Sequence, residues 1–139
     1  MNFNQLKQRF GSGDYKQMMA EFENELKQWG KLASGRIGTE YPALSPSVPT
    51  PIYRRSDIPM SDARFMQFEP HIVKLIKLRP DLYSVLLAKY VYKMPLRNEH
   101  DRKSYLARIG VLDLLEINKD KYFTKLECVK TVLFFAMSK

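Results

Sequence analysis

The sequence predicts an all-α protein in which a small helical domain ends in a helix-turn-helix and is preceded by an N-terminal helix and a Pro-rich basic linker or arm. Apolar residues recur every three to four positions over most of the chain, which is the period of an amphipathic helix. No stretch shows a convincing strand hairpin. Five of the eight prolines fall within residues 42–59, where their density excludes a helix or a central strand. The chain has 139 residues, 45% of them hydrophobic, which is enough to bury a core.

These patterns divide the chain into three segments. Residues 1–35 hold an amphipathic helix, and residues 36–60 form the Pro-rich linker or arm. Residues 61–139 form the helical domain with the helix-turn-helix at its end.

The first helix lies between glycines, with Asp14 as the expected N-cap and Gly35 as the expected stop. Its apolar residues share one face: Met18, Met19, Phe22, Leu26, Trp29 and Leu32. The charged residues lie mostly off that face. We expect Trp29 in the core, because it would reach an interface only if the helix packed loosely on the body.

The Pro-rich segment is expected to be extended and partly polyproline in character. Tyr53, Arg54 and Arg55 follow four of its prolines. The two arginines are candidate contacts to a phosphate backbone. A solvated linker explains the same residues equally well.

Three residues set the limits of the helices that follow. Ser61 is the expected N-cap of the next helix. Pro70 lies inside its apolar pattern and is expected to kink the helix or divide it. Pro80 suits the first turn of a further helix over residues 79–94.

The last third predicts the helix-turn-helix. Asp101 is the expected cap of a helix over 102–117, and Asn118 caps a second helix over 119–136. In this motif the second helix enters the major groove with its N-terminal end. The residues predicted to bind DNA are therefore, near the groove, Lys119, Lys121, Tyr122, Thr124 and Lys125, and on the backbone, Arg102, Lys103 and Arg108. A pair of ordinary amphipathic helices with solvated lysines gives the same pattern.

The charge of the chain points to an anionic partner. The chain has 23 Lys and Arg against 15 Asp and Glu, a net charge of +8, and half of the excess lies in residues 93–139. Nucleic acid, an acidic protein or a membrane surface would each fit this excess. The alternative is a basic soluble protein whose charge has no dedicated partner.

Catalysis finds no support in the sequence. His71 and His100 are isolated from plausible partners, and Cys128 lies in an apolar helical stretch as a small core residue. No Cys/His cluster has zinc spacing, and no glycine-rich turn forms a phosphate loop. We expect no enzyme activity, no cofactor or metal, and no small-molecule substrate. One cysteine and no long apolar run predict a cytoplasmic protein without a membrane partner.

Two stretches together resemble a known family. The first is "LKQWGKLAS", with Trp29 and Gly30 as a tryptophan–glycine pair. The second is the C-terminal third, in which eight residues resemble the family's tail pattern: Leu106, Ala107, Gly110, Val111, Tyr122, Phe123, Leu126 and Val129. The chain is similar to phage late-gene antitermination proteins of the Q type, in the phage 21-like lineage, whose helix-turn-helix resembles region 4 of bacterial sigma factors.

The resemblance implies a function in transcription. Such a protein binds double-stranded DNA near a phage late promoter, engages bacterial RNA polymerase and makes it read through terminators, in the cytoplasm of the bacterial host. Two alternatives remain open. One is a helix-turn-helix repressor or activator, and the other is a small phage inhibitor that binds a host protein.

Overall fold

The computed structural model describes residues 12–100 and 107–138, and these residues are mostly helical. Two two-residue strands form a short antiparallel ladder. The elements are α2 (Ser12–Ala33), η1 (Ser34–Arg36), η2 (Arg55–Asp57), α3 (Asp62–Leu78), α4 (Pro80–Leu86), η3 (Leu87–Val91), β1 (Glu99–His100), β2 (Ala107–Arg108), α5 (Val111–Leu115) and α6 (Lys119–Met137).

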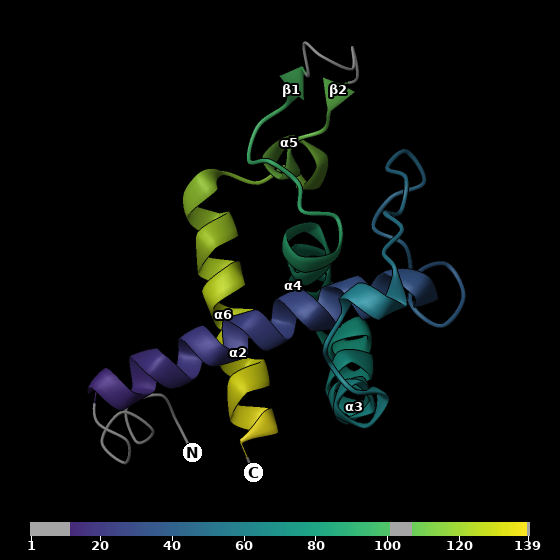
Figure 1. Ribbon diagram of the computed structural model, residues 1–139. Helices are drawn as coiled ribbons and strands as arrows, with labels where there is room; N and C mark the ends of the chain where they lie inside the picture. The colour runs from purple at the N-terminus through teal and green to yellow at the C-terminus, as the bar shows by residue number, and fades with distance from the viewer. Residues whose placement is uncertain (1–11, 101–106, 139) are drawn as a thin grey trace.

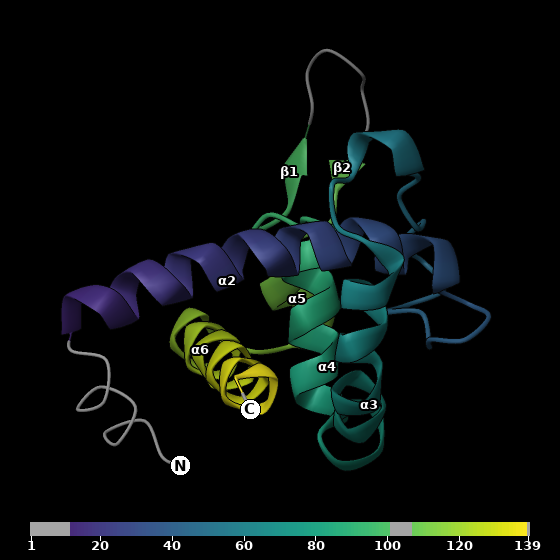
Figure 2. The ribbon, with the colours of Figure 1, turned by 60° about the horizontal axis from the view of Figure 1, so that its bottom comes forward.

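The long helix α2 lies across the other long helices (Figures 1 and 2). In Figure 2, α4 lies between α3 and α6, and α2 passes above all three. Helix α4 packs against both of its neighbours, and α2 packs against the turn of π-helix η3 that continues α4.

Aromatic side chains hold α2 on this layer. Trp29 has no solvent exposure, and its ring stacks 6.5 Å from that of Phe65 on α3. The centre of the Phe22 ring, also on α2, lies 6.0 Å from that of Phe68 on α3 and 5.5 Å from that of Phe134 on α6. The complete burial of Trp29 confirms its expected position in the core. A buried aromatic cluster of this kind supplies much of the stability of a small core.

Polar contacts reinforce the same arrangement. The guanidinium of Arg64 on α3 donates to Glu25 of α2 at 2.6 and 3.1 Å. Glu23, also on α2, accepts from the Tyr90 hydroxyl at 2.6 Å and pairs with the Lys130 ammonium at 3.2 Å. These contacts join α2 to α3, η3 and α6.

Local signals place most helix ends correctly. The Ser61 hydroxyl accepts from the Arg64 N–H at 3.1 Å, and Pro80 opens α4. The Asn118 side chain accepts from the Lys121 N–H at 2.8 Å. Asp14 is not the N-cap of α2, because the helix already includes Ser12 and Asp14 lies in its first turn.

Helix α3 continues through Pro70, so of the two expected effects of this proline, a kink or a division, the division is wrong. Proline removes one backbone hydrogen bond from the helix. Phe68 and Ile72, on either side, have no solvent exposure. Their burial holds both halves of the helix on the same core.

The Pro-rich segment is not a free arm. Tyr41, Ile58 and Met60 are buried in the core. Tyr83 of α4 donates its hydroxyl to the Pro42 carbonyl at 2.7 Å. Proline prevents regular structure in this segment, and its carbonyls and apolar side chains find partners on the helical body instead. All three segments expected from the sequence therefore contribute to one hydrophobic core.

The first helix of the expected helix-turn-helix is wrong over part of its length. Of the predicted helix 102–117, residues 102–106 lie outside the described part, as does its expected cap, Asp101. Ala107 and Arg108 form β2, which pairs with β1, and helix α5 covers only Val111–Leu115.

Long-range contacts explain this shortened helix. Gly110 N–H donates to the Asn98 side chain at 2.7 Å, and Val111 N–H donates to the Pro95 carbonyl at 2.8 Å. A Cβ atom on Gly110 would lie 2.4 Å from the carbonyl carbon of Arg97. The backbone of residues 95–98 thus occupies the place that another helical turn would need.

Three residues join α5 to α6. Glu116 adopts a left-handed backbone conformation with φ of +56°, and Asn118 caps α6.

Among the described residues, no helix has both the length and the apolar character needed to cross a membrane.

Candidate nucleic-acid interface

Helix α2 and the π-helix η3 meet backbone to backbone at Gly30. A Cβ atom on Gly30 would lie 2.1 Å from the carbonyl oxygen of Tyr90. Only glycine therefore permits this approach. The π-helical turn begins where α4 ends, and Tyr92 N–H donates five residues back to the Leu87 carbonyl at 2.9 Å. Single π-helical turns are rare in proteins, and many of those that occur lie at functional sites.

This approach gathers four lysines, which we call the lysine strip: Lys27 and Lys31 of α2, Lys89 of η3 and Lys93 just beyond it. Residues four apart are neighbours on a helix surface, so Lys27 and Lys31 share one side of α2. Three of the four, Lys27, Lys89 and Lys93, line a cavity of about 400 Å³ together with Tyr90 and Met94.

Lys93 is held in place by its surroundings. Its φ of +50° is uncommon for a residue with a side chain. Its carbonyl accepts from the Arg108 guanidinium at 3.0 Å, and its ammonium lies 5.3 Å from the centre of the Tyr53 ring. Backbone strain of this kind persists where surrounding contacts determine it, often at functional sites.

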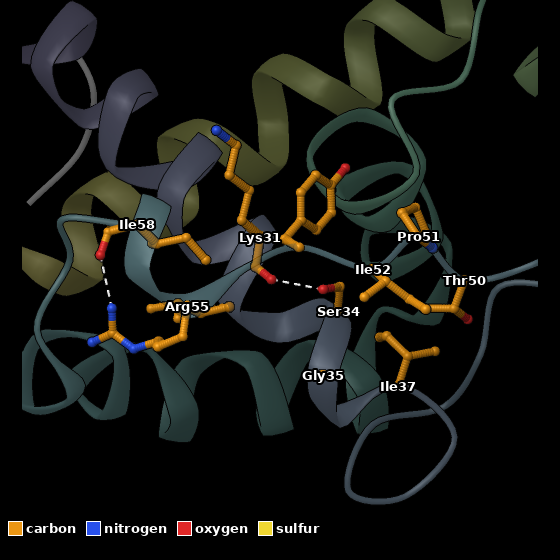
Figure 3. A pocket seen from close by; sticks show the side chains of 11 residues that line it. Lys31, Ser34, Gly35, Ile37, Thr50, Pro51, Ile52, Arg55 and Ile58 are labelled. Carbon is orange, nitrogen blue, oxygen red and sulfur yellow. Dashed lines mark hydrogen bonds between the residues drawn. The ribbon is translucent and has the colours of Figure 1, made fainter.

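A second cavity, of about 410 Å³, adjoins the strip (Figure 3). It lies between the C-terminal end of α2, with Lys31, and residues 50–58 of the Pro-rich segment. Tyr53 lines this cavity and lies beneath Lys93, so it joins the second cavity to the first. Its hydroxyl donates to the Val91 carbonyl at 3.1 Å, and this bond fixes the ring.

Within the described residues, no Asp or Glu lines either cavity, and no lysine of the strip forms an ion pair. The nearby carboxylate of Glu23 is engaged by Tyr90 and Lys130. Burial, followed by the bond to Glu23, raises the pKa of Tyr90, so its hydroxyl stays a neutral donor. The strip is therefore a cluster of uncompensated positive charge, which attracts polyanions.

No family model, curated protein or solved structure matches this chain.

The predicted DNA-binding residues do not all lie on one surface. Arg102 and Lys103 lie outside the described residues. Arg108 is exposed on β2, where its guanidinium bonds to the Lys93 carbonyl and lies 3.7 Å from the Glu99 carboxylate. It therefore contacts the lysine strip through the backbone of Lys93.

The start of α6 is exposed as expected, at Lys119, Lys121 and Thr124. Three carboxylates are exposed in the same region, on α5, the turn and α6: Asp113, Glu116 and Asp120. They offset the two lysines, and a compensated surface attracts phosphate less strongly.

Two predicted groove residues have structural roles instead. Tyr122 is 3% exposed and lies with Leu126 and Val129 on the core side of α6. Lys125 binds the Asp81 carboxylate at 3.1 Å. Tyr122 is thus part of the core and Lys125 is engaged by α4, so neither side chain is free at the surface where contact with bases was expected.

The two arginines of the Pro-rich segment differ. Arg55 donates to the carbonyls of Ile58 and Met60 at 2.7 and 2.9 Å, so its guanidinium fixes the local turn. Arg54 is exposed, next to Tyr53. Of the pair, Arg54 alone remains available to a phosphate.

Sequence inspection missed the lysine strip. Its members lie 58 or more positions apart between the two elements, as Lys31 and Lys89 show. The one local signal was Gly30 inside a helix, since an interior glycine often marks a close approach of another backbone.

Proposed function

We propose that this protein binds nucleic acid, and that the lysine strip holds the phosphate backbone. The observation that carries the proposal is the cluster of four lysines, from two elements, without a carboxylate among the cavity-lining residues. Phosphate contacts supply most of the affinity of nonspecific binding. Arg54 extends the same surface along the Pro-rich segment.

We further propose transcription antitermination as the process that this binding serves, with double-stranded DNA and bacterial RNA polymerase as partners. The support is the resemblance of the Trp29–Gly30 pair and of the C-terminal third to the Q-type family. The proposed helix-turn-helix takes a short form, α5 followed by a three-residue turn and α6.

Binding to duplex DNA at increasing salt tests the lysine strip. The triple variant Lys27→Gln, Lys89→Gln and Lys93→Gln should lower the slope of log affinity against log salt by about three units, because each phosphate contact contributes about one unit. Fluorescence anisotropy of a labelled duplex measures the slope with the full chain.

The matched control removes three exposed lysines that line neither cavity: Lys16→Gln, Lys74→Gln and Lys77→Gln. This control has the same net charge as the strip variant and should keep most of the slope. An equal loss in both variants would contradict a localised site. If Lys119→Gln with Lys121→Gln alone lowers the slope, α6 is the DNA surface.

In vitro transcription tests the antitermination proposal. The protein should raise read-through of a terminator by bacterial RNA polymerase, and polymerase should co-purify with it after nuclease treatment. Loss of polymerase with the DNA would instead favour a repressor or activator.

A further inference from the structure

A second surface lies between the C-terminal parts of α3 and α6. Its cavity has a volume of about 320 Å³ and is lined mainly by apolar side chains, among them Leu75 and Leu78 of α3 and Val132 and Ala136 of α6. Leu78 is 74% exposed and Val132 is 45% exposed. None of these residues belongs to the lysine strip. Clustered exposed apolar side chains mark interaction sites more often than scattered ones do.

The apolar lining of this cavity comes from two helices, and we call the surface between them the α3–α6 groove. Leu75 and Leu78 are three apart on α3, and Val132 and Ala136 are four apart on α6, so each pair shares one helix face. Ala136 is small and leaves room between the helices. A groove between two helices suits an amphipathic segment that inserts apolar side chains at similar spacing.

The polar margin of the groove is basic. His71, Lys74 and Arg79 line it, and no Asp or Glu does so among the described residues. The nearby Asp81 is engaged by Arg79 and Lys125, with N–O distances of 3.0 and 3.1 Å. Lys74 is exposed and forms no ion pair within the described part of the chain.

We propose that the α3–α6 groove binds an acidic amphipathic segment of a partner protein. Apolar side chains of that segment would contact Leu78 and Val132, and its carboxylates would meet Lys74, which forms no ion pair within the described residues. Charge complementarity selects this occupant. A second copy of the chain carries the same +8 charge and the same basic margin, and nucleic acid offers little to an apolar lining.

A peptide selection tests the groove with the full-length protein. A displayed library of short random peptides is selected on the wild type, and the enriched peptides are synthesised and titrated by fluorescence anisotropy. We expect enriched peptides with net negative charge and apolar residues three or four apart.

Leu78→Asp should weaken these peptides about tenfold or more, because it places a carboxylate in the apolar contact and repels theirs. Lys74→Glu should weaken them about threefold, as expected for an exposed charge at the margin. Ile52→Asp is the matched control, since Ile52 is 96% exposed and lies outside the groove. Leu78→Ser and Val132→Ser repeat the test without a new charge if Leu78→Asp does not fold.

Neutral or basic enriched peptides, or binding that both Leu78 variants leave unchanged, would overturn the proposal. A dimer of the free protein that Leu78→Asp dissociates would also overturn it, because a second copy would then occupy the groove. Groove variants should retain DNA binding, and strip variants should retain peptide binding, so the two proposals fail separately.

Discussion

Asp81 of α4 binds both the α3–α4 junction and α6 through a single carboxylate. Arg79, between α3 and α4, donates to it through Nε and Nη2, both at 3.0 Å, and Lys125 of α6 donates at 3.1 Å. The hydrogen bond from Arg79, followed by that from Lys125, holds the pKa of Asp81 well below its usual range. Asp81 also lies in the first turn of α4, where the helix dipole favours negative charge.

Asp81→Asn should therefore lower the free energy of unfolding at neutral pH by about 1 kcal/mol, a modest value because the side chain is 35% exposed and partly screened. A carboxyl whose folded-state pKa is depressed stabilises the protein above its unfolded pKa of about 4, and the contribution is lost as pH falls below that value. Urea unfolding at a series of pH values between neutral and about 2 measures the difference.

The difference between wild type and Asp81→Asn should shrink as pH falls. Asp57→Asn is the control, because Asp57 is exposed and forms no ion pair among the described residues. A difference that stays constant with pH would mean that Asp81 acts through packing.

The crossing of α2 and η3 depends on one glycine. A Cβ atom on Gly30 would meet backbone atoms of Tyr90 at 2.1 and 2.5 Å, and backbone cannot move aside as a flexible side chain can. In an open helix, Gly→Ala stabilises by about 1 kcal/mol. At this crossing the clash reverses the sign.

Gly30→Ala should thus destabilise the protein by about 2 kcal/mol or more in urea unfolding, because overpacking forces the two elements apart. Gly35→Ala is the matched control, since a Cβ atom there meets no other atom within 4 Å. Similar stability in the two variants would show that η3 shifts freely against α2, and the lysine strip would then lose its structural basis.

Across the whole molecule, tyrosine hydroxyls attach the Pro-rich segment to the helices. Tyr83 donates to Pro42 at 2.7 Å, Tyr53 donates to Val91 at 3.1 Å, and the Tyr92 hydroxyl lies 3.2 Å from that of Thr50. Burial raises the pKa of Tyr83, which keeps its hydroxyl neutral and able to donate. The segment should therefore unfold together with the helices.

Tyr83→Phe should reduce the free energy of unfolding by about 1 kcal/mol, because it leaves the Pro42 carbonyl without this donor. Tyr41→Phe is the matched control: Tyr41 is 2% exposed, and its hydroxyl has no hydrogen-bond partner among the described residues. The control should be neutral or slightly stabilising. Urea unfolding and the rate of proteolysis after Arg54 measure both effects. Equal behaviour of the two variants would contradict attachment through Tyr83.

Features encoded locally followed from the amino-acid order alone. Helical periodicity predicted the mostly helical fold, and the caps Ser61 and Asn118 marked two helix starts because each side chain binds a backbone N–H three residues on. The apolar face of α2 likewise predicted the burial of Trp29. Each of these features depends on neighbours within one or two helical turns.

Only the tertiary fold decided the features that involve distant partners. Residues 95–98 form hydrogen bonds with the backbone before α5 and so limit the length of that helix. Asp81 binds Lys125, a residue that the sequence predicted on the DNA-binding face. The backbone contact at Gly30 brings Lys27 beside Lys89, although neither position indicates the other in sequence. Helical spacing reveals which residues share a face, but the partner of that face depends on how all the elements pack together.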